Sequence, residues 1–195
     1  VRDVTASFEA YEVYPAARAI ETFVDELSNW YVRRSRRRFW KSGADADKQA
    51  AYATLHTCLL TVAKLVAPFT PFVAEELYRN LTGQTKDEGR KTDVASSSLA
   101  PGFSSTVAES VHLAAWPQVD EALLDEGLVA DTEALLQAVT LGRAARKNAG
   151  LKVRLPLSEL WVRSSNPAAT AGVKRFEEEL RDELNVKSVR YLDAA

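Results

Sequence analysis

The chain has 195 residues, of which 46% are hydrophobic and 27% are charged, a composition that predicts a buried core and excludes an intrinsically disordered protein. A single cysteine excludes an internal disulfide framework and a multi-cysteine zinc site, and no apolar run approaches the roughly eighteen residues that a membrane-spanning helix needs. The net charge is only −2, but 11 of the 25 lysines and arginines lie in two short segments that contain no acid. Methionine is absent even at position 1, so we expect a segment of a longer protein.

Hydrophobic periodicity predicts helices through the first eighty residues. Residues 3–10 are expected to form a short helix, and a long amphipathic helix should run from Pro15 to about residue 41. Residues 45–67 are apolar nearly all round in their second half, which favours a central helix of a bundle. Thr70 and Pro71 form an N-cap and first-turn pair that opens a further helix to about residue 81.

The pattern then changes twice. Residues 82–110 are rich in glycine, serine, threonine and charge, so we expect a flexible insertion, followed by an extended segment that docks Trp116. A helical region should cover residues 120–149, in one piece or in two around Gly127. The segment 155–165 is typical of a strand, 166–184 of a helix and 185–193 of a second strand. The predicted fold class is mainly α, a helical bundle over residues 1–150 with a small strand–helix–strand appendage over 151–195.

The first basic segment ends the long helix. At about 100° per residue, the apolar stripe of Ile20, Phe23, Leu27 and Trp30/Tyr31 continues into arginines and a lysine. That stripe takes in Arg34, Arg38 and Lys41, with Arg33 and Arg37 on its flank and Arg36 on another face. Because unpaired arginines are too costly to bury, we expect either that the helix projects past its bundle or that this face meets acids or phosphates.

Several partners would satisfy such a helix. Arginine binds phosphate in a bidentate manner and keeps its charge, and Trp40 or Phe39 could stack on an unpaired RNA base. A purely structural alternative is a solvated basic helix end, where the macrodipole favours cations and salt bridges stabilise the fold. An anionic membrane surface is a weaker alternative, because the segment lacks an apolar insertion face.

A second basic segment runs across the expected end of the 120–149 helix. It supplies five further candidate contacts, Arg143, Arg146, Lys147, Lys152 and Arg154. The first three also fit an ordinary last helical turn, whereas Lys152 and Arg154 follow Gly150 and fit it less well.

The histidine and cysteine residues are not spaced as in known catalytic sites. His56 and Cys58 are two residues apart on a helix and therefore point to different sides, which argues against a Cys–His dyad. The sequence also contains no glycine-rich phosphate loop and no HExxH motif. It therefore predicts no catalytic residue and no metal site.

Three stretches of the sequence resemble isoleucyl-tRNA synthetases. "FVDELSNWYVRRSRRRFWKSG" resembles the signature helix of their anticodon-binding domain, and "AAYATLHTCLLTVAKLVAPFTPFVAEELYRNL" resembles the following bundle helices of class I synthetases for Ile, Val and Leu. "ARKNAGLKVRLPLSELWV" is similar to the junction beyond that bundle. The resemblance covers nearly all of the chain outside about 82–110, and the arginine run is its most specific part.

The resemblance implies a function as well as a fold. It implies an anticodon-binding helical bundle over 1–150 and a small α/β junction over 151–195, in a cytoplasmic, ATP-dependent isoleucine–tRNA ligase. The expected partners are the anticodon stem-loop of tRNA(Ile) and the catalytic domain of the same parent chain. We expect this segment to be non-catalytic and to hold no cofactor, with ATP and Mg²⁺ bound elsewhere in the parent. In the alternative, the arginine helix docks on the catalytic domain and RNA is contacted by other residues.

Overall fold

The computed structural model describes residues 1–40, 43, 45–84 and 107–192, and these residues pack as two compact units, Val1–Val119 and Asp120–Ala195. The described part is mainly helical with a two-stranded sheet, as predicted. The expected boundary at 150/151 followed the change from helical to strand periodicity. The units divide earlier, because helix α6 (Glu126–Asn148) packs on α7 (Pro167–Arg175) and α8 (Glu177–Leu184).

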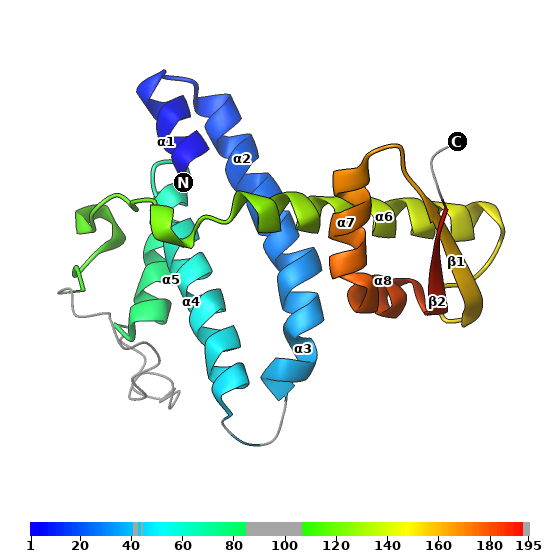
Figure 1. Ribbon diagram of the computed structural model, residues 1–195. Helices are drawn as coiled ribbons and strands as arrows, with labels where there is room; N and C mark the ends of the chain where they lie inside the picture. Colours follow the sequence, from blue (N-terminus) through cyan, green and yellow to red (C-terminus); the bar gives the residue numbers. More distant parts are fainter. Residues whose placement is uncertain (41–42, 44, 85–106, 193–195) are drawn as a thin grey trace. The chain divides into compact units, whose positions relative to one another are not determined.

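The first unit is built of helices. Figure 1 shows α2, η1 and α3 as one continuous rod in blue, beside the antiparallel pair α4 and α5 in cyan and green. Its elements are α1 (Arg2–Glu9), α2 (Val13–Glu26), the π-helical η1 (Leu27–Val32), α3 (Arg33–Trp40), α4 (Ala46–Val66), α5 (Pro71–Thr82) and the 3-10 turn η2 (Val111–Leu113). The helix starts follow the sequence: the Asp45 side chain accepts from the Lys48 amide, and Pro71 opens α5 as expected.

Two clusters of buried residues hold this unit together. Val4, Ala16, Ile20 and Leu65 join α1, α2 and α4, and Trp116 packs against this cluster while its indole Nε1 donates to Thr5 at 2.9 Å. The second cluster joins α4, α5 and η2. The segment after residue 107 is therefore docked through Trp116, as predicted. Of the predicted insertion over 82–110, residues 85–106 lie outside the described residues.

Glu75 of α5 holds the start of η2 through hydrogen bonds to Ser110 and Val111. Its carboxylate accepts from the Val111 amide at 2.9 Å and from the Ser110 hydroxyl at 2.8 Å, and it pairs with Arg79 at 2.7 Å. The Val111 hydrogen bond, helped by Ser110 and Arg79, holds the pKa of Glu75 below its ordinary value despite partial desolvation.

The second unit is a small α/β layer. Strands β1 (Leu157–Arg163) and β2 (Val186–Leu192) pair in parallel, and the connection between them consists of α7 and α8. The sequence predicted one helix over 166–184, but the chain forms two, because Phe176 leaves helical geometry at φ −111° and ψ 32°. The predicted cap at Asn166 is confirmed, since its side chain accepts from the amides of Ala168 and Ala169.

A buried arginine closes the end of α6. Arg146 is only 5% exposed, and its guanidinium donates to the carbonyls of Leu184 at 3.0 Å, Leu155 at 2.5 Å and Lys152. Gly150 ends the helix in the left-handed region at φ 67°, as its position in the sequence indicated. The guanidinium thus ties α6, the loop after it and the end of α8 to one another.

We expect Glu75→Gln to lower the melting temperature at pH 7 by a few degrees. A carboxylate whose pKa is depressed by folding stabilises the fold above its unfolded-state pKa, and this stabilisation is lost as the pH falls through the folded-state pKa. The difference between wild type and variant should therefore shrink below pH about 4. Thermal unfolding across pH measures it, with the exposed neighbour Glu76→Gln as control; a difference that does not change with pH would contradict the assignment.

We expect Arg146→Ala to lower the free energy of unfolding by about 3 kcal/mol or more, since it leaves buried carbonyls without donors. Arg146→Lys should recover only part of the loss, because an ammonium group lacks the planar fork. The control is Lys147→Ala, which removes the exposed cation next to Arg146 in α6 and should cost at most about 1 kcal/mol. Urea unfolding that gives equal losses for the two alanine variants would refute this role.

Candidate nucleic-acid interface

The inward face of α3 differs from the predicted one by about one residue. Ser35 is the most deeply buried residue of the helix at 4% exposure, while Arg34 and Arg38 are half-buried. The cause is η1, whose π-helical turns close one residue later than α-helical turns and so delay the phase of everything that follows. The uniform 100° step had carried the apolar stripe onto Arg34 and Arg38; the extra residue moves it onto Ser35 and Phe39.

Three contacts fix this inward face against α4. The Tyr31 hydroxyl donates to the Ala51 carbonyl at 3.0 Å, and the rings of Phe39 and Tyr52 lie 4.9 Å apart. The Arg38 guanidinium pairs with Asp47, with its Nη2 2.8 Å from the carboxylate and 3.1 Å from the carbonyl oxygen. Arg38 thus meets an acid within its own unit, one of the two kinds of partner that the sequence predicted for this face.

The outward face of α3 carries three further charges of the run. Arg33, Arg36 and Arg37 are exposed, and Trp40 is exposed by 78% at the same helical spacing. We call these four residues the arginine face. The Arg36 guanidinium lies 5.4 Å from the centre of the Trp40 ring, and the Arg33 Nε donates to the Asn29 carbonyl at 2.9 Å. Three cations and one aromatic ring therefore share one surface.

The sequence predicted only part of the arginine face. Arg33, Arg37 and Trp40 were among the predicted contacts, but Arg36 was assigned to another face of the helix. The cause is that a uniform step of 100° per residue takes no account of the π-helical turn. The four-residue spacing of Arg36 and Trp40 would have indicated that they lie together. Arg34 sits over the Trp30 ring at 5.0 Å, between the two faces. Lys41, also predicted, lies outside the described residues.

The five candidates of the second basic segment do not form one patch. Arg146 is buried among carbonyls, and Arg143 pairs with Glu183 at 2.5 Å. Lys147, Lys152 and Arg154 are exposed, and no ion pair joins them to an acid among the described residues. The Asn185 side chain donates to the carbonyls of Val153 and Arg154, which holds the loop that carries Lys152 and Arg154 against the start of β2.

Other polar groups have structural partners. His56 Nε2 lies 3.0 Å from the Leu81 carbonyl, and partial burial raises the pKa of the Cys58 thiol, which disfavours the reactive thiolate. Within residues 1–40, 45–84 and 107–192 no group of three or more histidine, cysteine or acidic side chains could hold a metal ion. No helix in these ranges is both long and apolar enough to cross a membrane.

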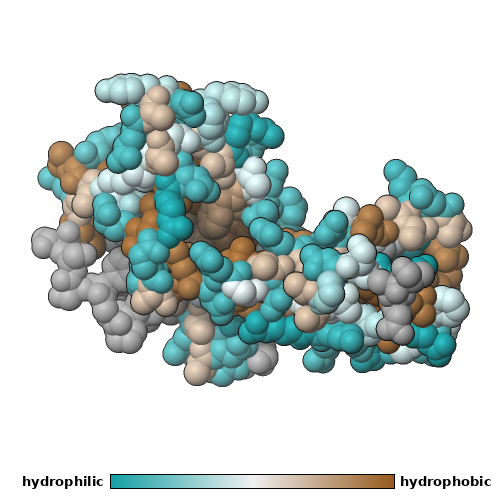
Figure 2. Space-filling view, turned by 45° about the horizontal axis from the view of Figure 1, so that its top comes forward, coloured by the Kyte–Doolittle hydropathy of each residue, from teal (hydrophilic) through white to brown (hydrophobic). Residues whose placement is uncertain are grey.

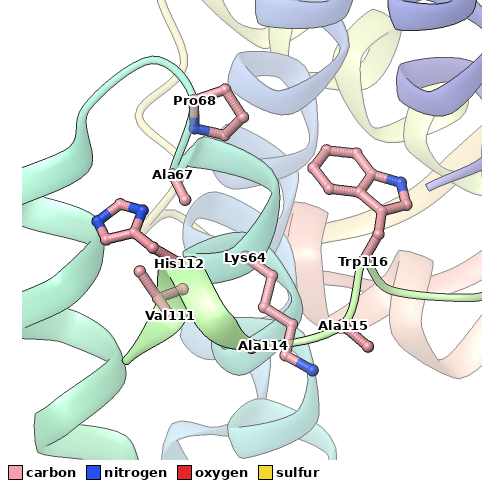
Figure 3. A pocket seen from close by; sticks show the side chains of 8 residues that line it. All are labelled: Lys64, Ala67, Pro68, Val111, His112, Ala114, Ala115 and Trp116. Carbon is pink, nitrogen blue, oxygen red and sulfur yellow. The ribbon is translucent and has the colours of Figure 1, made fainter. Parts of the chain in front are cut away.

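A shallow pocket lies between the end of α4 and η2. Figure 3 shows Lys64, His112 and Trp116 around it, with small side chains between them. Its volume is about 210 Å³, below the roughly 300 Å³ of typical small-molecule sites. Figure 2 shows hydrophobic residues in brown scattered among hydrophilic ones on the visible surface of both units. The arginine face is the stronger candidate, because it concentrates one charge with an aromatic ring.

Comparisons with known proteins agree on the kind of domain. The family model described as "Anticodon-binding domain of tRNA ligase" matches residues 1–160. The chain is 47% identical over 193 residues to an isoleucine–tRNA ligase of Deinococcus radiodurans and 46% identical over 194 residues to one of Thermus thermophilus, with 99% of this chain covered in each case. It is 49% identical over 189 residues, 97% of its length, to an isoleucine–tRNA ligase of Dehalococcoides mccartyi strain CBDB1.

These relatives are much longer proteins. The chain spans 16% of the Deinococcus ligase and 17% of each of the other two. The long helix with its π-helical turn, the α4–α5 pair and the first four residues of β1 all fall within the matched residues. The chain belongs to the family of anticodon-binding domains of tRNA ligases.

Proposed function

We propose that this chain positions the anticodon stem-loop of tRNA(Ile) within an isoleucine–tRNA ligase, and that the arginine face contacts the RNA. The observation that carries the proposal is the gathering of Arg33, Arg36, Arg37 and Trp40 on one exposed helical surface. The membership of an anticodon-binding family supports RNA as the partner.

The chemistry of this face suits a nucleic acid. Each guanidinium can bind a phosphate in a bidentate manner, and every phosphate neutralised releases condensed counterions, which favours binding. The face also lies at the C-terminal end of a long helix, where the macrodipole stabilises cations before any RNA arrives. Trp40 adds a flat apolar surface for an unpaired base of the loop.

The chemical steps of tRNA aminoacylation are assigned to other domains of the parent protein. The chain covers about a sixth of the length of the ligases that it resembles, so most of such a protein lies outside it. We propose that the parent is an ATP-dependent, cytoplasmic ligase whose catalytic domain binds ATP and Mg²⁺. This chain then contributes RNA binding without catalysis of its own.

A second candidate function is architectural. The contact of Arg38 with Asp47 demonstrates that an arginine of α3 can take a carboxylate as its partner. In this alternative the arginine face docks on an acidic surface of the parent's catalytic domain, and RNA is contacted by other residues. The two candidates differ in what happens to binding when the exposed charges are removed.

We expect Arg33→Ala with Arg37→Ala, made in the intact ligase that contains this chain, to weaken tRNA(Ile) binding and to reduce its salt dependence. The slope of log affinity against log salt should become shallower by roughly 0.7–0.9 for each phosphate contact that is lost. The melting temperature should stay close to that of the wild type, because both side chains are exposed.

The matched control is Arg18→Ala. It removes an exposed cation that pairs with Glu21 on α2, away from the arginine face. It should leave both the affinity and the slope nearly unchanged. An unchanged slope in the double variant, together with a lower melting temperature, would reject the RNA-binding role and support the architectural one.

A further inference from the structure

One face of the two-stranded sheet in the second unit is open. The parallel register places Trp161 beside Arg190 and Arg163 beside Leu192, and all four side chains are exposed. The alternate residues of both strands are partly buried on the opposite face, where α8 packs on β2 and the Lys174 ammonium of α7 lies 5.0 Å from the Tyr191 ring. Figure 1 shows β1 and β2 side by side next to α8. Among residues 120–192, the helices therefore pack on one face of the sheet, and the side chains of the other face are exposed.

The open face carries a preformed pair of an indole and a guanidinium. Trp161 is 61% exposed, and its Nε1 donates to the Glu159 carboxylate at 2.5 Å. The other oxygen of Glu159 pairs with the Arg190 Nε at 3.1 Å, and the Arg190 guanidinium lies 5.9 Å from the centre of the indole ring. One carboxylate thus fixes both side chains, and it uses the inner nitrogen of the arginine rather than the outer fork.

The charges of this unit are divided between its layers. The helix that packs on β2 is strongly acidic, and its carboxylates are Glu177, Glu178, Glu179, Asp182 and Glu183, against a single Arg181. The open face carries two arginines, Arg163 and Arg190, against the single Glu159, which pairs with Arg190, so the face keeps an excess of one positive charge. A partner of the open face is therefore selected for negative charge and for a flat group that can stack on an indole.

We propose that the open face of β1 and β2 is a second RNA-contact surface, which takes an unpaired base on Trp161 and the neighbouring phosphates on Arg190 and Arg163. The proposal rests on the proposed function, because the RNA is the same tRNA. Phosphate and base occur together in a single-stranded or looped nucleotide, whereas a duplex hides its base faces. The family model matches only residues 1–160, so Trp161 and all of β2 lie beyond it.

The test is tRNA binding by the intact protein that contains this chain, with nucleotide-resolved chemical probing of the bound RNA. Removing a base–aromatic stack by Trp161→Ala should weaken binding by roughly five- to a hundredfold, and protection should be lost at one or a few unpaired nucleotides. Trp161→Phe should restore most of the affinity, because a phenyl ring still stacks. Arg190→Ala should weaken binding and make the salt dependence shallower.

Two controls match these variants within the same unit. Leu141→Ala removes an exposed apolar side chain from α6, and Arg181→Ala removes an exposed cation from α8. Both should bind tRNA as the wild type does. Failure of this proposal is separable from failure of the arginine face: if Arg33→Ala with Arg37→Ala weakens binding and Trp161→Ala does not, only the sheet proposal fails.

The competing occupant of the open face is a polypeptide segment of the intact protein. Selective oxidation of exposed tryptophans in the absence and presence of tRNA, followed by peptide mapping, distinguishes this occupant from RNA. Trp161 should react freely and become protected when tRNA is added. Protection of Trp161 before RNA is added, with a lower melting temperature and unchanged tRNA affinity in Trp161→Ala, would overturn the proposal.

Discussion

The π-helical segment Leu27–Val32 sets the direction of every side chain that follows it in the long helix. Its wider turns place Ser35 and Phe39 against α4, and a serine is small enough to be buried there without an unpaired charge. The same shift turns Arg33 and Arg37 directly outward. If the helix kept a uniform α-helical period, Arg34 and Arg38 would point into the bundle, where guanidinium groups are costly to bury.

The contacts around this segment explain why the phase is held. Tyr31 at its end bonds the backbone of α4, and Arg38 and Phe39 make two further contacts with the same helix. These interactions lie on one side of α3. Within the run of arginines, Arg38 therefore contacts the bundle, whereas Arg33, Arg36 and Arg37 are exposed on the opposite side.

The second basic segment also contains both a buried and an exposed cation, for a different physical reason. Arg146 lies within reach of carbonyls from residues 152, 155 and 184, and it is buried because those carbonyls would otherwise lack donors. Lys147, one residue along the helix, points elsewhere and is exposed. Adjacent cations thus have opposite environments, because Arg146 faces the three carbonyls and its guanidinium has enough donors to satisfy them.

The sequence by itself determined the helices of the first unit, the strand–helix–strand order of the second, the helix start at Pro71, the stop at Gly150, and the relationship to a tRNA-ligase domain. These features follow from local periodicity, from the backbone limits of proline and glycine, and from residues that identify the family. Only the tertiary structure decided which arginines face outward, that Arg146 is buried, and that Trp161 and Arg190 share an open face. Each of these depends on hydrogen bonds or strand register between residues that are distant in the sequence, or on one widened helical turn that a fixed period cannot represent.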